Sequence, residues 1–218
     1  MGRVSTAIVF AGGDPPSERA LRGLPAADLV VAADSGLGHA HALGCAVDLV
    51  VGDLDSVDPD TLDDAVRAGA VVERHPEAKN ATDLELALLA VRDRGATDVV
   101  VLGGHGGRLD HFLGNVLQLS SPNLAGMRVR ALLDDAQVIV VRDQVELTAS
   151  PGALCSLLPV GGPAHGVRTE GLRYPLLGET LFPGSTRGVS NEFLASHASV
   201  SLERGVLLAV LPDPRKDI

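Results

Sequence analysis

Charged side chains follow three apolar runs of this 218-residue chain, each at the point where the run ends. Asp34 follows the run at 28–33, and Asp53 and Asp55 follow the run at 47–52. Two carboxylates one residue apart on an extended loop point the same way, and such a pair suits Mg2+, which takes its remaining ligands from water and phosphate. A polar turn whose aspartates cap neighbouring backbone groups is the alternative. Because acidic residues also follow other apolar runs of the chain, we favour the metal site over the polar turn.

The third cluster is the glycine-rich stretch GGHGGRLDHFLGN at 103–115. It lacks the GK[ST] ending of a P-loop and the GxGxxG spacing of a dinucleotide site, so a P-loop kinase and a Rossmann dehydrogenase are poorly supported. Glycines that open a helix still present free N–H groups to an anion, and Arg108 adds a fork of donors suited to phosphate. A plain turn, with Arg108 solvated and Asp110 stabilising the helix N-terminus, explains the stretch equally well.

A fourth polar cluster, KNATD at 79–83, lies at the head of the best predicted helix. In this helix, at 82–95, Thr82 and Glu85 form a capping-box pattern. Further helices are predicted at 36–44, 58–69 and 108–120, and each lies between Val-, Ile- and Leu-rich runs. This alternation predicts a mainly parallel sheet with helices on its faces. Such sheets bind ligands at the carboxyl ends of their strands, which is where the polar clusters fall.

From about residue 144 the chain changes to short apolar runs broken by Gly, Pro, Ser and Thr, without a good helix. Regular short strands with frequent turns predict a smaller all-β sandwich or barrel. We therefore expect an α/β domain at 1–143 and an all-β domain at 144–218, with the boundary near 143–146.

The composition excludes several functions. The net charge is −10, and nearly all of the acidic excess lies before residue 144. Such a chain is a poor binder of nucleic acid or membranes, which need basic patches, but it can bind phosphates through a metal ion. No apolar run approaches the ~20 residues of a membrane span, and the N-terminus does not read as a signal peptide. Cys45 and Cys155 lie in apolar surroundings without a CxxC motif, as in reduced cytoplasmic proteins.

The assembled motifs resemble those of the thiamine pyrophosphokinase family, also called thiamin diphosphokinase. They are AADSGLGHAHALGCAVDLVVGDLDSVDP, KNATDLELAL, GGHGGRLDHFLGN and GLRYPL with GVSNE, and their order and spacing match from about residue 5 to 211. The resemblance implies an α/β catalytic domain followed by a β-sandwich domain that binds thiamine. It implies transfer of a pyrophosphoryl group from ATP to the hydroxyl of thiamine, with Mg2+, giving thiamine diphosphate and AMP. It also implies a homodimer whose active sites lie between the N-terminal domain of one subunit and the C-terminal domain of the other.

The resemblance also implies site residues. The carboxylates expected at the catalytic centre are Asp53, Asp55, Asp83 and Asp110, of which the first three are expected to hold Mg2+. The residues expected near ATP are Asp34, Lys79, Gly104, Gly107 and Arg108. The residues expected near thiamine are Tyr174, whose ring would stack on the substrate, Ser190 and Asn191. Which aspartate takes the proton of the thiamine hydroxyl is left open.

Two positions depart from the family pattern. Asn80 stands where the family often has aspartate, which removes one carboxylate near the metal. Tyr174 stands where eukaryotic members often have tryptophan, so the stacking face is smaller. Two other functions stay open: a non-catalytic thiamine- or nucleotide-binding protein of the same fold, which Asn80 favours, and a pyrophosphokinase for another heterocyclic alcohol.

Overall fold

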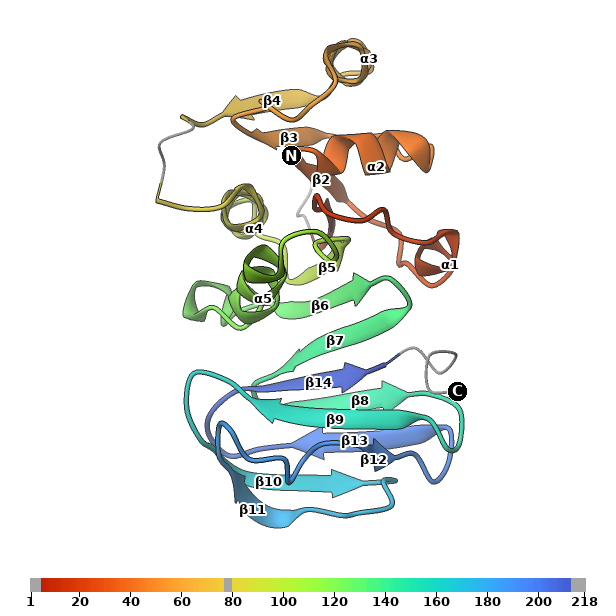
Figure 1. The fold of residues 1–218 in the computed structure, drawn as a ribbon, viewed down its shortest axis with the longest axis vertical. Helices are drawn as coiled ribbons and strands as arrows, with labels where there is room; N and C mark the ends of the chain where they lie inside the picture. The colour runs from red at the N-terminus through yellow and green to blue at the C-terminus, as the bar shows by residue number, and fades with distance from the viewer. Residues whose placement is uncertain (1–4, 77–79, 213–218) are drawn as a thin grey trace. The chain divides into compact units, whose positions relative to one another are not determined.

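The computed structural model describes residues 5–76 and 80–212. The chain divides into two compact units, Met1–Asp135 and Ala136–Ile218, whose elements are labelled in Figure 1. Lys79, expected near ATP, lies outside the described residues. The units divide several residues before the position at which the sequence changes character. The strand that opens the second unit, AQVIVV, is as apolar as the buried parallel strands, so composition alone groups it with them.

The first unit is built on a parallel sheet of six strands in the order β6-β5-β1-β2-β3-β4. The strands are β1 (Thr6–Phe10), β2 (Leu29–Ala33), β3 (Leu49–Gly52), β4 (Val71–Arg74), β5 (Asp98–Leu102) and β6 (Arg128–Leu133). Strands β1, β2, β3 and β5 are almost wholly buried, which fits a sheet covered on both faces. The predicted α/β domain is confirmed.

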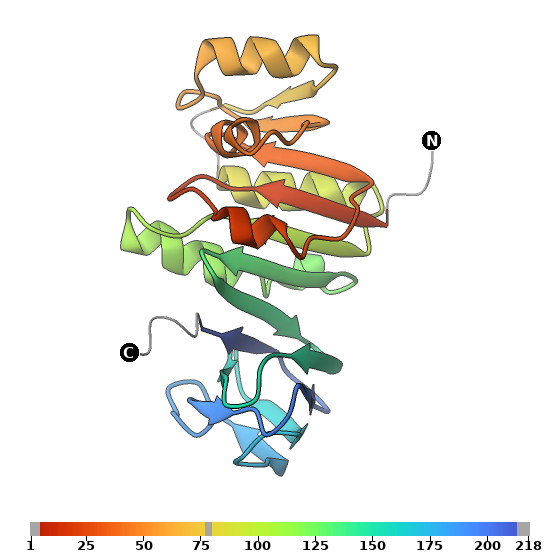
Figure 2. The same ribbon diagram turned by 90° about the vertical axis from the view of Figure 1, so that its right-hand side faces the viewer.

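Helices cover both faces of this sheet, as Figure 2 shows for α1 in front of it and α4 behind it. The helices are α1 (Glu18–Leu21), α2 (Gly36–Ala42), α3 (Pro59–Arg67), α4 (Asp83–Asp93) and α5 (Leu109–Gln118), with a 3-10 turn at Pro122–Leu124. The cap predicted at Thr82 is present, because the Thr82 hydroxyl accepts from the Glu85 N–H at 3.2 Å. The structure adds a cap at Asp58, which accepts from the Thr61 N–H at 2.9 Å. The short α1 and the 3-10 turn have no periodicity that would have predicted them.

The second unit consists of two antiparallel sheets in the orders β12-β9-β14-β7 and β11-β10-β13-β8. Its strands are β7 (Ala136–Val141), β8 (Gln144–Thr148), β9 (Leu154–Pro159), β10 (Ala164–Glu170), β11 (Leu177–Leu181), β12 (Asn191–Glu192), β13 (His197–Ser201) and β14 (Leu207–Leu211). One apolar core takes side chains from both sheets, so the unit is a β-sandwich, as predicted.

Both cysteines are free thiols. Burial raises the pKa of the Cys155 thiol to about 12, which makes it an inert core side chain. No helix in the described ranges is long and apolar enough to span a bilayer.

Candidate active site

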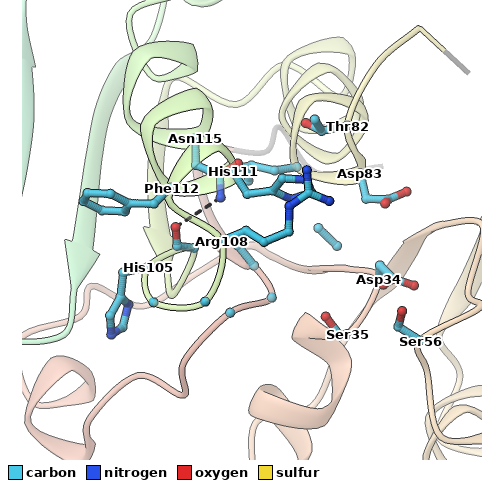
Figure 3. Close-up of a pocket in the computed structure, with 18 of the residues that line it drawn as sticks. Asp34, Ser35, Ser56, Thr82, Asp83, His105, Arg108, His111, Phe112 and Asn115 are labelled. Carbon is cyan, nitrogen blue, oxygen red and sulfur yellow. Dashed lines mark hydrogen bonds between the residues drawn. The ribbon is translucent and has the colours of Figure 1, made fainter.

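A cavity of about 420 Å3 lies at the carboxyl ends of the parallel strands of the first unit (Figure 3). Its walls are the loops after β1, β2, β3 and β5 and the first turns of α4 and α5. Residues of all three polar clusters that follow apolar runs line this one cavity, as does Asp83 at the head of α4. Asp110, predicted at the catalytic centre, is not among the lining residues. The placement follows from the parallel sheet, because every strand of such a sheet delivers its following loop to the same edge.

Three carboxylates meet on one side of the cavity, and we call Asp34, Asp53 and Asp83 the carboxylate cluster. One oxygen atom from each lies within 4.8 Å of an oxygen of the other two. Figure 3 shows Asp34 and Asp83 on the same side of the cavity, at the end of β2 and the start of α4. Oxygen donors at this spacing are those that a hard divalent cation such as Mg2+ prefers.

Gly52 at the end of β3 makes this convergence possible. Its φ is +153°, and an added Cβ would lie 3.0 Å from Oδ1 of Asp83 and 3.2 Å from Cβ of Asp34. The backbone N–H of Asp34 also donates to the carbonyl of Val51 at 2.9 Å, which ties the two strand ends together. A side chain at position 52 would push the carboxylates apart.

The electrostatics of the cluster favour a bound cation. Burial raises the pKa of Asp34 above its ordinary value, and the negative charges of Asp83, Asp53 and Asp55 add to the shift, against a lowering by the backbone N–H of Ser35. Oδ1 of Asp34 is buried and has no hydrogen-bond partner in the described part of the chain. A buried, unpaired carboxylate oxygen facing like charges is costly, and a metal ion would satisfy it.

Asp53 and Asp55 do not act as the matched pair that an extended loop would give. The residue between them, Leu54, has φ +65°, in the left-handed region that a bulky side chain rarely adopts. Asp53 therefore joins the carboxylate cluster, while Asp55 lines the cavity from an exposed position and accepts the Ser56 hydroxyl at 2.9 Å. Burial of the Leu54 side chain, 8% exposed, offsets the backbone strain.

The glycine-rich loop after β5 lies against the loop after β1. The N–H of Gly104 donates to the carbonyl of Gly12 at 2.7 Å, and Nδ2 of Asn115 donates to the carbonyl of Gly104 at 3.1 Å. Gly103 has φ +81°, and a Cβ there would lie 2.7 Å from the carbonyl oxygen of Ala11. The glycines thus let two backbone segments approach each other at the cavity wall. Gly104 and Gly107, both predicted near ATP, lie on this wall.

Arg108 and Asp110 form a bidentate ion pair beside the glycine loop. Nε of Arg108 lies 3.1 Å from one carboxylate oxygen of Asp110, and Nη2 lies 2.6 Å from the other. The pair is mostly exposed, and the Arg108 guanidinium lowers the pKa of Asp110 to about 2. Asp110 is therefore ionised throughout the neutral range and is a weak base.

The residues predicted near thiamine lie in the second unit. The Tyr174 side chain is exposed, whereas Asn191 is buried and hydrogen-bonded to the Tyr174 backbone. Ser190 is exposed and has φ +56°. The two consecutive residues that were predicted near thiamine, Ser190 and Asn191, therefore differ in solvent accessibility.

Several cavity residues were not identified from the sequence. They are Gly12, Gly13, Ser35, Ser56, Thr82, His111, Phe112 and Asn115. Gly12 and Gly13 follow the first apolar run, so the rule of strand ends, applied to that run as well, would have found them. Arg108, His111 and Asn115 share one side of α5 by their spacing of three and four residues, a signal also present in the sequence.

Comparisons with known proteins agree with this architecture. The family model described as thiamin pyrophosphokinase, catalytic domain, matches residues 22–131, and the model described as thiamin pyrophosphokinase, vitamin B1 binding domain, matches residues 139–207. The thiamine pyrophosphokinase of Bacillus subtilis is 28% identical over 162 residues, which cover 73% of this chain and 75% of that protein. Thiamine pyrophosphokinase 1 of Arabidopsis thaliana is 28% identical over 155 residues, 66% of this chain and 57% of that protein. The chain thus spans less than two thirds of the plant relative.

Solved structures share the fold over nearly the whole chain. The crystal structure of thiamine pyrophosphokinase from Bacillus subtilis superposes with a TM-score of 0.82 at 24% identity, covering 95% of this chain and 98% of that one. Thiamin pyrophosphokinase from Candida albicans gives a TM-score of 0.81 at 13% identity, covering 96% and 89%.

Proposed function

The chain belongs to the thiamin pyrophosphokinase family, and we infer that it transfers the pyrophosphoryl group of ATP to the hydroxyl of thiamine, giving thiamine diphosphate and AMP. The catalytic-domain model covers the loops that carry Asp34, Asp53, Asp83 and Arg108, and the vitamin B1 binding model covers Tyr174 and Ser190. The observation that carries the activity is the carboxylate cluster beside a glycine loop at the strand ends. Such a cluster can hold the divalent cation that neutralises phosphoryl oxygens during transfer from ATP.

We propose that the carboxylate cluster holds Mg2+ on the ATP phosphates, with Asp55 contributing from the exposed side of the cavity. The buried, unpaired oxygen of Asp34 adds this residue to the set proposed from the sequence, Asp53, Asp55 and Asp83. When bound, the metal would neutralise charge on the phosphoryl oxygens. Asn80, three residues before Asp83 in the sequence, removes one carboxylate that the family often has. Asp34 supplies a carboxylate oxygen to the set that remains.

The chain's own residues supply positioning and positive charge. The backbone of Gly104 and Gly107, which lines the cavity, is proposed to contact the phosphates. Arg108 would add a planar fork of donors when a phosphate replaces Asp110 as its partner. Lys79 is proposed as a second cation at the same site. Since the transferred group passes through a loose transition state, such positioning matters more than a covalent nucleophile. Asp110, with a pKa of about 2, serves to orient Arg108 rather than to accept the hydroxyl proton.

Thiamine is proposed to contact Tyr174 and Ser190 in the second unit and to present its hydroxyl to the carboxylate-rich cavity. A tyrosine ring offers a flat face for stacking on a heterocycle. The negative cavity also attracts the cationic thiazolium ring of the substrate.

We propose that the enzyme is a cytoplasmic homodimer with shared active sites. Helix α5 leaves Leu109, Leu113 and Leu117, spaced four residues apart, 68%, 50% and 56% exposed. The second unit leaves Leu177 and Phe182 73% and 56% exposed. Exposed apolar patches of this kind usually mark protein contacts, and a second copy would cover them. The free cysteines fit the reducing cytoplasm.

The function is tested by measuring AMP released from ATP and Mg2+, with and without thiamine. Thiamine-dependent AMP is expected; its absence would refute the proposed activity, and release with another heterocyclic alcohol alone would favour a related pyrophosphokinase. Asp55→Ala is expected to abolish turnover and leave the fold intact, because an exposed loop carboxylate contributes little to packing. Asp63→Ala, which removes an exposed aspartate of α3 away from the cavity, is the matched control and should keep full activity.

A further inference from the structure

Asn191 is one of the few polar residues buried in the described chain, with 5% of its surface exposed. It lies in β12, where it pairs with Cys155 of β9, so its backbone is fixed by the sandwich. Its side chain reaches the segment between β10 and β11 and binds one residue there at both ends. Nδ2 of Asn191 donates to the carbonyl of Tyr174 at 2.7 Å, and Oδ1 accepts the Tyr174 N–H at 2.9 Å.

This pair of hydrogen bonds reproduces what a neighbouring strand would provide. A backbone in a sheet exchanges one donor and one acceptor with its partner, and here one amide side chain supplies both. Oδ1 also accepts the N–H of Glu192 at 2.9 Å, so the acceptor capacity of Asn191 is filled. The side chain is therefore committed to backbone groups and is not exposed to a ligand.

The residues before Tyr174 are held to the same strand. The N–H of Arg173 donates to the carbonyl of Glu192 at 2.8 Å, and the two side chains form an ion pair at 2.8 Å. Leu172 forms an isolated bridge with Phe193. Tyr174 thus has a fixed backbone, yet its side chain is 54% exposed.

We propose that Asn191 is a positioning residue that fixes the backbone of Tyr174, so that the exposed ring is ordered before a flat heterocyclic substrate arrives. The proposal rests on the proposed function, in which the Tyr174 ring contacts thiamine, and it assigns Asn191 a role through Tyr174 instead of a direct contact. Holding an aromatic side chain in its bound arrangement raises affinity, because less freedom is lost on binding. Ser190, which is exposed, remains the residue of this pair that can touch the ligand.

The chain carries its own probe for the first half of this proposal. It has one tyrosine and no tryptophan, so tyrosine fluorescence comes from Tyr174 alone. In the absence of any ligand, Asn191→Ala is expected to lower the fluorescence anisotropy of Tyr174. Thr169→Val is the matched control: Thr169 is also buried, and its hydroxyl accepts the N–H of Leu176 in the same segment at 2.9 Å. It should reduce thermal stability while leaving the anisotropy close to wild type.

Kinetics test the second half. Asn191→Ala is expected to raise the KM for thiamine about three- to tenfold, the range that ordering one side chain contributes, with the KM for ATP and kcat nearly unchanged. In a Tyr174→Ala background the same substitution should add no further effect on the KM for thiamine, because a residue that acts through Tyr174 has nothing left to position. If Asn191→Ala does not fold, Asn191→Asp keeps the accepted bonds, loses the donated one, and should show the same changes.

The outcomes separate this proposal from the proposed function. Unchanged anisotropy in a folded Asn191 variant, or an equal rise of the KM for thiamine with and without the Tyr174 ring, would overturn the positioning role while leaving the activity standing. A wild-type protein without thiamine-dependent AMP release would overturn the proposed activity. A lower anisotropy in Asn191→Ala would then still support the role of Asn191 in fixing the backbone of Tyr174. A fall in anisotropy with an unchanged KM for thiamine would overturn the role in substrate binding.

Discussion

Replacing Asp34 by asparagine is expected to stabilise the metal-free protein at neutral pH. Asp34 lies beside Asp53 and Asp83, and burial together with the charges of these residues raises its pKa. Asparagine has nearly the same shape but carries no charge, and its amide can donate to the neighbouring carboxylates. The position has φ +47°, which asparagine tolerates as well as aspartate, so backbone strain does not confound the comparison.

The size of the effect follows from the spacing. The oxygen atoms of the cluster lie within 4.8 Å of one another. At that upper bound, two unit charges repel by about 3.5 kcal/mol at an effective dielectric of ~20 and by about 0.9 kcal/mol in bulk water. Asp34 has two such neighbours, but it is only half-buried, and solvent screens part of the repulsion. We therefore expect Asp34→Asn to raise the free energy of unfolding by about 1–3 kcal/mol at pH 7.

The pH dependence has a definite sign. Because the pKa of Asp34 is raised on folding, the native state binds its proton more tightly than the unfolded state, and stability falls as the pH rises through the folded pKa. Below the ordinary value of 3.8 the group is protonated in both states. The advantage of Asp34→Asn should therefore be greatest above the folded pKa of Asp34 and shrink as the pH falls toward 3.8.

Urea unfolding in EDTA, followed by circular dichroism between pH 3.5 and 7.5, measures this difference. Asp28→Asn is the control of opposite sign: Asp28 accepts hydrogen bonds from the N–H groups of Thr6 and Ser5 and from the Ser5 hydroxyl, which lower its pKa, so its loss should destabilise. A titration with Mg2+ completes the test, since wild type should gain about 2.7 kcal/mol at 100 times Kd and Asp34→Asn distinctly less. An Asp34→Asn protein that is less stable than wild type at pH 7 in EDTA would refute the electrostatic reasoning.

Substitutions at three further positions test other parts of the site. Gly52→Ala places a Cβ 3.0 Å from Oδ1 of Asp83 and should lower the free energy of unfolding by about 1–3 kcal/mol and weaken Mg2+ binding; wild-type affinity in calorimetry would contradict the role of this glycine. Tyr174→Phe should keep the KM for thiamine within about threefold and Tyr174→Ala should raise it about tenfold, with the KM for ATP as the internal control; equal effects would argue against stacking. Arg108→Ala should return the pKa of Asp110 from about 2 toward 3.8, as followed by NMR titration, and should raise the KM for ATP. In wild type, the ion pair stabilises the fold above pH 3.8, and this contribution is lost as the pH falls toward 2. The variant should lack this pH-dependent contribution.

The sequence predicted the fold well where local signals agree. Thr82 caps α4 as predicted, because its side chain satisfies a free backbone N–H, and Pro59 marks the start of α3, since proline fits the first turn of a helix. Strand β7 (Ala136–Val141) belongs to the second unit, which local signals in the sequence did not predict. Its partner β14 lies about seventy residues later in the chain, and a pairing over that distance leaves no trace in local composition.

The sequence predicted a group of carboxylates at this edge of the sheet, but it did not predict correctly which aspartates meet there. The strand-end rule brought Asp34, Asp53 and Asp83 to one sheet edge from their positions after apolar runs or at a helix start. The rule says nothing about the direction of a side chain inside a loop, and the alternation assumed for Asp53 and Asp55 requires an extended residue between them. Leu54 is left-handed instead, and its own burial in the core beneath helix α3 holds it there. Core packing thus decides which aspartate joins the cluster.

The same separation between residue type and orientation applies to Ser190 and Asn191. The resemblance placed both residues near thiamine as a pair, and neighbours in a motif are easily given the same role. Ser190, however, precedes β12 with a left-handed φ of +56° and is exposed, whereas Asn191 is the first residue of β12 and is buried. The buried amide has to satisfy its hydrogen bonds inside the protein, and it does so on the backbone of the residue whose ring is exposed. A motif of two polar residues therefore combines one exposed group with one that holds a third residue in place.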